Sequence, residues 1–268
     1  MTRTSFLLAG LVLASCAMQS TAPSSSVSPA LRAEFAPSGT LVAGVNYGNP
    51  VIAQKDAAGG DPRGVGPELA RELARRLGVP IRYVTYDNAG KVAEAVKQGA
   101  WDVAFLAVDP ARAPDIDFSA PYVQIEGTYL VRVDSPLRRI ADVDRDGIRV
   151  AVGDKTAYDL YLTRTLTHAK LVKAPTSLAA VELFRAQGLE AAAGVKNPLV
   201  AIAAKDATVR VIEGNFMVIG QASGVPRGRS QAAQYLRAYI EEMKASGFVA
   251  AKLKESGVTD AAVAPPAT

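Results

Sequence analysis

The sequence predicts an α/β protein folded as two lobes. Short apolar runs alternate with longer amphipathic ones, which is typical of strands joined by helices. This order occurs twice along the chain, and two further apolar, β-rich runs at 128–133 and 216–222 are predicted to cross between the resulting lobes. Ligands of open α/β sheets bind outside the carboxyl ends of the strands, so two facing lobes would enclose a cleft.

The first unit combines predicted strands at 41–45, 81–84 and 101–106 with helices at 67–77 and 91–98. In the first helix, Leu69, Leu73 and Leu77 recur every fourth residue while charged residues occupy the other sides. Such a pattern predicts a helix with one face on a sheet. Pro67 is a typical helix start and Gly78 a typical stop.

The second unit repeats the order with strands at 148–152, 170–172 and 191–195 and helices at 156–167 and 178–187, the latter capped by Ser177. Helices at 230–244 and 248–254 then return to the first lobe. We therefore predict a discontinuous first lobe (39–130 and 218–257), a second lobe (131–217) and a disordered tail (258–268).

The first residues are predicted to be a signal or lipoprotein segment, 1–16, followed by a flexible tether, 17–38. An apolar run at 6–14 is too short to span a bilayer and suits an export signal. The following LASC resembles a bacterial lipobox, which favours lipidation of Cys16 after cleavage. Cleavage without lipidation and a buried free cysteine are the alternatives.

Composition excludes several classes of function. The 30 Lys and Arg residues are scattered among 26 Asp and Glu residues, so a nucleic-acid partner is not expected. A single cysteine and a single histidine, His168, do not support a disulfide or a metal site. Motifs of hydrolases and nucleotide-binding enzymes are absent from the sequence, so neither catalytic residues nor a cofactor are predicted.

Several motifs in order resemble those of one protein family. They are SGTL at 38–41, GV at 64–65, DPAR at 109–112, DFSAPY at 117–122 and the helix-ending stretch at 239–247. Residues 39–257 thereby resemble the bacterial extracellular solute-binding proteins of the polar amino-acid uptake family, family 3. The resemblance implies a type II periplasmic-binding-protein fold with two hinge strands. It also implies a periplasmic monomer that delivers a small solute to the membrane permease of an ATP-binding-cassette importer.

Arg112 is the first candidate for ligand binding. A guanidinium offers forked donors that match the two oxygens of a carboxylate, and the resemblance implies that Arg112 grips the carboxylate of the ligand. The alternative is an arginine in a surface turn, or a partner of Asp115 or Asp117.

Other candidates follow predicted strands. Asn46, Tyr47 and Asn49 come after the first strand, and Tyr86 after the second. Tyrosines can stack on a ligand and asparagines can donate hydrogen bonds, although the same residues suit a turn. Lys155 and Thr156 join a strand to a helix, where an anion or an ordinary helix cap is expected.

The sequence departs from the family at 194–197, where amino-acid receptors usually carry an aspartate for the ammonium group of the ligand. Lys196 stands there instead, within one residue of alignment, and would attract a second anion; a solvated lysine is the alternative. Ala107 likewise stands where a hydroxyl residue often helps to bind the ammonium group. Asp109 or Glu126 could still pair with an amine. The expected ligand is therefore anionic or an atypical amino acid.

An enzyme on the same scaffold is the alternative, because the resemblance extends to cyclohexadienyl (prephenate/arogenate) dehydratases. Such chemistry needs a general acid in the cleft, and Glu126 and Glu213 are the candidates. A receptor that presents its ligand to a sensor protein is a further option.

Overall fold

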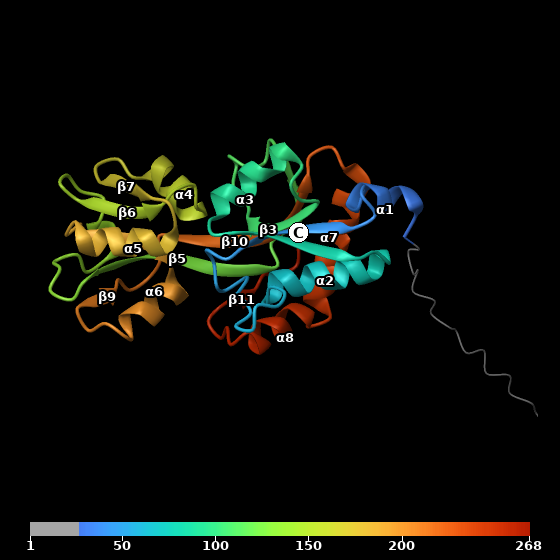
Figure 1. Cartoon of the computed structure of the whole chain (residues 1–268). Helices are drawn as coiled ribbons and strands as arrows, with labels where there is room; N and C mark the ends of the chain where they lie inside the picture. The colour runs from blue at the N-terminus through green and yellow to red at the C-terminus, as the bar shows by residue number, and fades with distance from the viewer. Residues whose placement is uncertain (1–26) are drawn as a thin grey trace, which may run out of the picture.

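The computed structural model describes residues 27–268 and consists of two α/β lobes joined by two long strands (Figure 1). All strands belong to one mixed 11-stranded sheet whose main order is β2-β1-β3-β10-β5-β8-β6-β7. The predicted fold class, a two-lobed type II periplasmic-binding-protein fold, is confirmed. The predicted segment 1–16, with Cys16, lies outside the described residues.

Lobe 1 is built on a parallel arrangement of β1 and its two neighbours, in which Leu41 of β1 is opposite Ile81 of β2 and Ala43 is opposite Val103 of β3. Its strands are β1 (Leu41–Asn46), β2 (Ile81–Tyr86), β3 (Val103–Ala107) and β4 (Ile116–Phe118). Its helices are α1 (Pro29–Phe35), α2 (Val65–Leu77), α3 (Ala89–Ala95) with the short η1 (Val96–Gln98), α7 (Ser230–Ala245) and α8 (Phe248–Glu255).

Lobe 2 repeats this plan, with β6 paired in parallel to both β7 and β8. Its strands are β6 (Arg149–Gly153), β7 (Lys170–Ala174), β8 (Ala191–Val195) and β9 (Val209–Val211). Its helices are η2 (Ile140–Asp142), α4 (Ala157–Thr165), α5 (Ser177–Ala186) and α6 (Lys196–Ala203).

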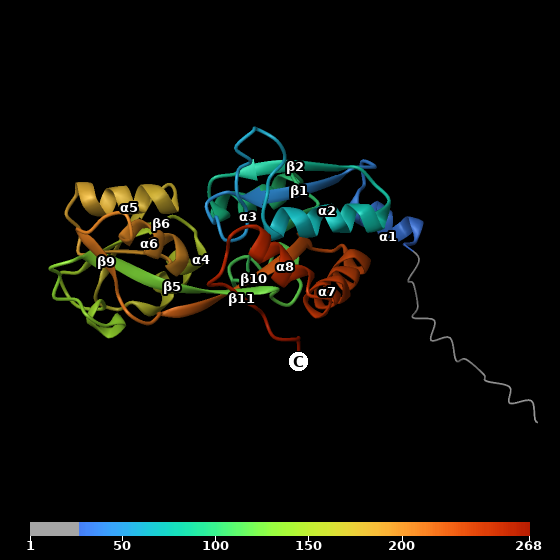
Figure 2. The ribbon, with the colours of Figure 1, turned by 90° about the horizontal axis from the view of Figure 1, so that it is seen from below.

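The connection between the lobes consists of β5 (Val123–Arg132) and β10 (Met217–Pro226). They pair antiparallel from Val123 opposite Gln221 to Gly127 opposite Met217. Beyond this ribbon β5 continues into lobe 2 beside β8, whereas β10 continues into lobe 1 beside β3. Figure 2 shows both strands running across the gap between the lobes.

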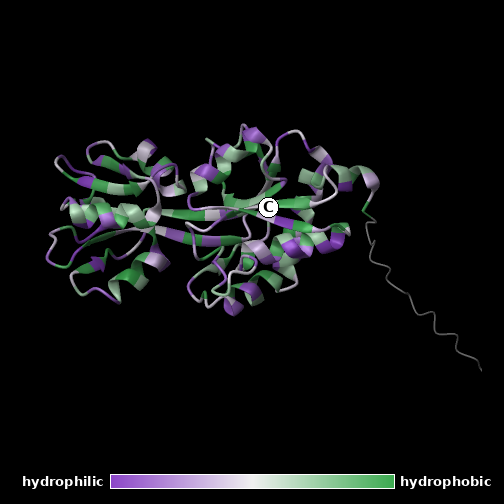
Figure 3. Cartoon of the chain, in the orientation of Figure 1, coloured by the Kyte–Doolittle hydropathy of each residue, from purple (hydrophilic) through white to green (hydrophobic). Residues whose placement is uncertain are grey.

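Each lobe has a core of its own, formed where helices cover the sheet. Leu69, Leu73 and Leu77 of α2 are completely buried, as their spacing predicts. The helix ends at Gly78 with φ 66°, a left-handed conformation that glycine adopts without steric cost. Figure 3 shows hydrophobic residues concentrated along the central strands of both lobes and hydrophilic ones on the outer faces of the helices.

The predicted tether is wrong over its last part, because residues 29–35 form helix α1. Ser28 caps this helix by accepting a hydrogen bond from the N–H of Leu31 at 3.0 Å. Phe35 is fully buried and meets the edge of Tyr235 on α7, with ring centroids 5.9 Å apart. Two apolar side chains, Leu31 and Phe35, thus anchor the segment in lobe 1.

The predicted disordered tail is also wrong in part. Residues Ala262–Val263 form β11, which pairs antiparallel with Val123 and Gln124 of β5. Ala264 is buried, and the Nζ of Lys244 donates to the carbonyl of Pro265 at 2.8 Å.

Other elements absent from the prediction are β4, β9 and α6, which are short or begin without a capping side chain. The cap of α5 is Thr176 rather than Ser177.

Among residues 27–268, none of the helices has the length and apolar character needed to cross a lipid bilayer.

Candidate functional site

A cleft lies between the lobes and has a wide outer chamber of about 740 Å³ and a narrow inner chamber of about 30 Å³. The two chambers share Gly48, Ser177 and Val195 in their walls, so they form one continuous space. Lobe 1 contributes residues at the carboxyl ends of β1, β2 and β3. Lobe 2 contributes residues around the amino-terminal ends of α4, α5 and α6. The expected position of a ligand in this topology is therefore the cleft.

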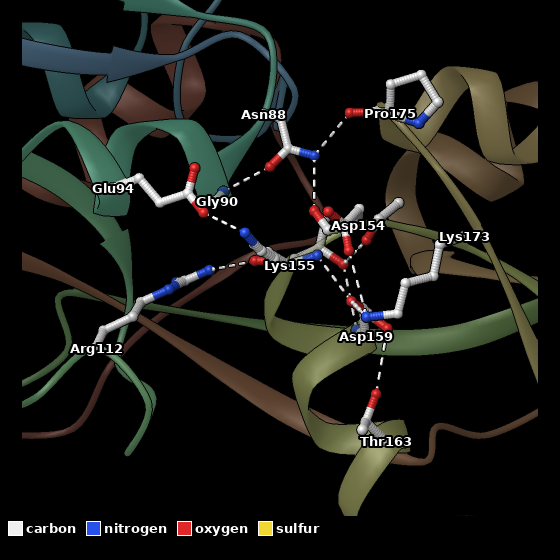
Figure 4. Close-up of polar contacts among 12 residues, drawn as sticks. Asn88, Gly90, Glu94, Arg112, Asp154, Lys155, Asp159, Thr163, Lys173 and Pro175 are labelled. Atoms are coloured by element: carbon white, nitrogen blue, oxygen red, sulfur yellow. Dashed lines mark hydrogen bonds and ion pairs between the residues drawn. The ribbon is translucent and has the colours of Figure 1, made fainter.

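Arg112 lies in the wall of the inner chamber with only 4% of its surface exposed. Its Nη1 donates to the carbonyl of Ala107 at 2.7 Å, within lobe 1. Its Nη2 donates to the carbonyl of Lys155 at 3.0 Å, on lobe 2. The guanidinium is thus held by two backbone groups across the cleft, and Figure 4 shows the second of these contacts.

Among the residues that the structure describes, Arg112 is a buried cation without a carboxylate partner. The ion pairs formed by the described residues do not include it, since the neighbouring Asp109 pairs with Arg164 instead. Burial lowers the pKa of Arg112 to about 10, with the charge of Asp109 acting in the opposite direction. At neutral pH the guanidinium still carries its charge, and an anion in the inner chamber would compensate it.

Three buried amides line the same chamber: Asn46, Asn49 and Gln221. The Oδ1 of Asn46 accepts from the N–H of Gly48 at 2.9 Å, and that of Asn49 accepts from the N–H of Val51 at 3.3 Å. These bonds form the turn after β1. The side-chain NH₂ groups of all three amides donate no hydrogen bond to other residues within 27–268. They are therefore available as donors to a ligand.

Thr156 borders the inner chamber on lobe 2 and is the N-cap of α4. Its Oγ1 accepts from the N–H of Asp159 and donates to the carbonyl of Gly153 at 2.8 Å. The hydroxyl is therefore committed to the cap. Lys155, the residue before it, has φ 55°, which is uncommon for a residue other than glycine. In this conformation the carbonyl of Lys155 accepts the hydrogen bond from the Nη2 of Arg112.

The outer chamber has walls of different character. Lobe 1 supplies Tyr47 and Tyr86 together with Lys55, whose Nζ lies 5.6 Å from the centre of the Tyr47 ring. Lobe 2 supplies an apolar wall that consists of Leu178, Val181, Ala193, Val195, Pro198, Leu199 and Ile202. Charged groups in the two chambers are Lys55, Lys91, Arg112 and Asp87, so cations exceed carboxylates.

Direct contacts hold the two lobes together beside the cleft (Figure 4). The Nδ2 of Asn88, the cap of α3, donates to the carbonyls of Asp154 and Pro175, both at 2.9 Å. Lys155 pairs with Glu94 across the same boundary. Asp109 and Arg164 form a further pair with an oxygen–nitrogen distance of 2.9 Å. With these contacts formed, the lobes are in a closed arrangement.

Three predicted ligand residues have other positions. Lys196 points away from the cleft: its Nζ pairs with Glu126 at 2.6 Å, and both residues line a separate cavity near the hinge. Asp109 and Lys155 lie beside the cleft, where their side chains pair across the lobes. The prediction that Lys196 attracts an anion in the cleft is therefore wrong, because α6 begins at this residue and turns its side chain outward.

The two acids proposed for a dehydratase are also outside the cleft. Glu126 accepts from Lys196 and from the Nδ2 of Asn215, and Glu213 forms a backbone bridge with Arg139. Neither residue lines a chamber. In the described part of the chain, no cluster of three or more His, Cys, Asp or Glu residues could hold a metal ion.

Sequence reasoning missed most of the outer chamber. Lys55 and Lys91 gave no signal in the sequence, because one lies on a long loop and the other on an exposed helix face. Leu178 falls at the start of a predicted helix, where nothing in the sequence distinguishes it from a residue of the helix core. The position of these groups depends on how the second lobe faces the first, which local patterns do not determine.

Comparison with known proteins agrees with the fold. Residues 41–255 match the family described as bacterial extracellular solute-binding proteins, family 3. The amino-acid-binding protein AabA of Dichelobacter nodosus is 27% identical over 96 residues, which are 35% of this chain and 38% of that protein. The match therefore spans little more than a third of this relative.

Solved structures cover more of the chain. A mutant of the protein ArgBP from T. maritima has a TM-score of 0.73 at 21% identity, covering 85% of this chain and 100% of that one. A solute receptor for L-cysteine of Neisseria gonorrhoeae has a TM-score of 0.73 at 24% identity, covering 84% and 92%. An ancestral amino acid-binding protein, a precursor of cyclohexadienyl dehydratase, has a TM-score of 0.70 at 24% identity, covering 85% and 99%. At these identities the likeness concerns the fold.

Proposed function

We propose that this chain, which belongs to the bacterial extracellular solute-binding proteins of family 3, is a non-catalytic receptor for a small solute that carries a carboxylate. The carboxylate occupies the inner chamber on Arg112 and the rest of the solute occupies the outer chamber. The closed receptor delivers the solute to the membrane permease of an ATP-binding-cassette importer.

The observation that carries the proposal is the buried, unpaired charge of Arg112. A charge removed from water without a partner is unfavourable, and such groups are normally paired. Arg112 is instead fixed by two carbonyls at the edge of a chamber large enough for a carboxylate. Buried amide donors of Asn46, Asn49 and Gln221 complete a site suited to an anion with several acceptor oxygens.

The partner and cellular location are supported by the family alone. Its members are extracellular, and the relatives include a receptor for L-cysteine and the protein ArgBP. We extend the proposal to a monomer exported to the periplasm, with Cys16 as its lipid anchor. A Cys16→Ser variant should then shift from the membrane fraction to the soluble periplasmic fraction.

The test of the carboxylate site is Arg112→Met, with binding measured by calorimetry and thermal shift for a panel of carboxylates. We expect the carboxylate that stabilises the native protein to lose at least 100-fold in affinity. Ligand-free protein should remain folded, because removing an unpaired buried charge offsets the two lost hydrogen bonds.

A matched control is Arg210→Met. Arg210 also donates to backbone carbonyls, those of Val133, Ser135 and Leu137 at 3.3, 2.9 and 2.7 Å, but it lies on lobe 2 and lines neither chamber. Its replacement should leave affinity unchanged. Equal affinities of the Arg112→Met variant and the native protein would contradict the proposal.

A further inference from the structure

The outer chamber offers a ligand apolar contacts on one side and aromatic contacts on the other. Leu178, the second residue of α5, has 63% of its surface exposed, which is high for a large apolar side chain. It lies in the same wall as Pro198, Leu199 and Ile202, opposite Tyr47 and Tyr86 of lobe 1. This arrangement leaves an apolar surface uncovered within the cleft, where a ligand can bury it.

The same chamber is poorly suited to bind a cationic group of a ligand. Its only carboxylate among the described residues is Asp87, which is 60% exposed and pairs with Lys91 at 2.8 Å. Lys55 lies in the same wall and forms none of the ion pairs seen in residues 27–268. An ammonium group of a ligand would lose its hydration there and face two lysines, which opposes binding.

The sizes of the two chambers indicate which part of the ligand each of them holds. The inner chamber of about 30 Å³ is comparable to the space occupied by a few water-sized probes, so it admits a carboxylate and little else. The outer chamber of about 740 Å³ must then hold the remainder, including any group on the carbon next to the carboxylate.

We infer that the cleft selects carboxylates with a bulky apolar or aromatic remainder and does not require an ammonium group. The inference rests on the proposed carboxylate site at Arg112 and adds the class of solute to it. Apolar burial against Leu178, Leu199 and Ile202 supplies affinity, and Lys55 and Lys91 disfavour ligands with a positively charged group.

Calorimetry with three carboxylates tests this class: 3-phenylpropionate, L-phenylalanine, which adds an ammonium group to the same skeleton, and L-arginine. We expect 3-phenylpropionate to bind at least 10-fold more tightly than L-phenylalanine and L-arginine to bind most weakly. Acetate, which lacks the apolar remainder, should bind at least 100-fold more weakly than 3-phenylpropionate. Tighter binding of either amino acid than of 3-phenylpropionate would overturn the inference.

Two substitutions of Leu178 separate apolar contact from charge. Leu178→Asn should weaken 3-phenylpropionate about 10-fold, whereas Leu178→Asp should weaken it further and improve L-arginine relative to the Asn variant. Val133→Gln is the control, because Val133 is an exposed apolar residue that lines neither chamber. Unchanged preference in both Leu178 variants would contradict the assignment of the apolar wall.

The Arg112→Met variant distinguishes failure of the proposed solute class from failure of the proposed carboxylate site. Loss of binding in this variant together with a preference for amino acids would overturn only the solute class. Retention of binding in this variant would overturn the carboxylate site itself.

Discussion

Gly90 of α3 and Lys155 before α4 meet across the cleft so closely that a Cβ atom at position 90 would lie 2.6 Å from the Cβ of Lys155. Gly90 also donates its N–H to the side chain of Asn88, which bonds to Asp154 and Pro175 on lobe 2. The absence of a side chain at position 90 is therefore a condition of the closed arrangement.

Gly90→Ala should weaken ligand binding about 10-fold without unfolding the protein. Alanine is a better helix former than glycine, so α3 itself is not weakened, but the added methyl group prevents the lobes from reaching their closed separation. Calorimetry gives the affinity, and small-angle scattering with saturating ligand should show a larger radius of gyration than for the native complex. Gly60→Ala is the control, because a Cβ there meets only the end of the Asp56 side chain. Equal affinities of the Gly90→Ala variant and the native protein would contradict this account of closure.

Arg164→Met should lower ligand affinity about 3- to 10-fold by removing the interlobe partner of Asp109. The Asp109 side chain is almost fully buried in the closed form, so an unpaired carboxylate would favour separation of the lobes, where water can reach it. Binding isotherms at low and moderate salt measure the effect. Arg185→Met removes an ion pair with Asp206 inside lobe 2 and should have no effect on affinity. A similar loss of affinity in both variants would indicate a general effect of charge.

Phe35→Ala should lower the free energy of unfolding by about 3 kcal/mol, the usual cost of truncating a buried aromatic residue. Phe35 is the last residue of α1; it packs against Tyr235 of α7 and is completely buried. Chemical denaturation of the native and variant proteins measures the change. Val108→Ala, which truncates a residue with 44% of its surface exposed, should change stability by less than about 0.5 kcal/mol. A negligible effect of Phe35→Ala would restore the interpretation of this segment as a tether.

Glu72→Gln should lower stability by about 1 kcal/mol at pH 7, and the difference should shrink steadily as the pH falls from 4.5 through about 2. Hydrogen bonds from Arg75, and also from Arg76, lower the pKa of Glu72 from 4.5 to about 2, against the effect of burial. The folded state therefore binds this proton less tightly than the unfolded state. The stabilising contribution is complete above pH 4.5 and is lost as the pH falls to about 2.

Denaturation midpoints of the native protein and the Glu72→Gln variant, measured between pH 2 and pH 7, test this dependence. Glu182→Gln is the control, since Glu182 is an exposed acid on α5 that forms no ion pair within the described residues. A difference between native and variant proteins that is constant with pH would contradict the role of the Glu72 carboxylate.

The secondary structure was predictable where local patterns are strong. The buried leucines of α2 and the repeated strand–helix order determine most elements and the two-lobed fold. Helix α1 was missed because its only apolar anchors, Leu31 and Phe35, lie among serines, alanines and prolines that suggest a linker. Their burial depends on Tyr235 and α7, which are distant in the sequence.

Part of the candidate site was predictable from strand ends and from the family motif that contains Arg112. Asn46, Tyr47, Asn49 and Tyr86 line the cleft, as their positions at or just after the ends of β1 and β2 suggest. The position of Lys196 was not predictable because α6 begins at this residue without a capping side chain, and the helix turns the lysine toward Glu126 rather than into the cleft. The partners of Asp109 and Lys155 lie on the opposite lobe, so only the tertiary arrangement reveals them.

Strand β11 lies beside β5 where β5 leaves lobe 1, so three strands rather than two run together at the start of the hinge. A ribbon of three strands resists bending more than a pair, and Lys244 ties the third strand down through the carbonyls of Pro121 and Pro265. Apparent affinity scales with the fraction of molecules that are already in the binding-competent arrangement. We expect the carboxyl-terminal residues to affect solute affinity through this strand, although residues 262–268 line neither chamber.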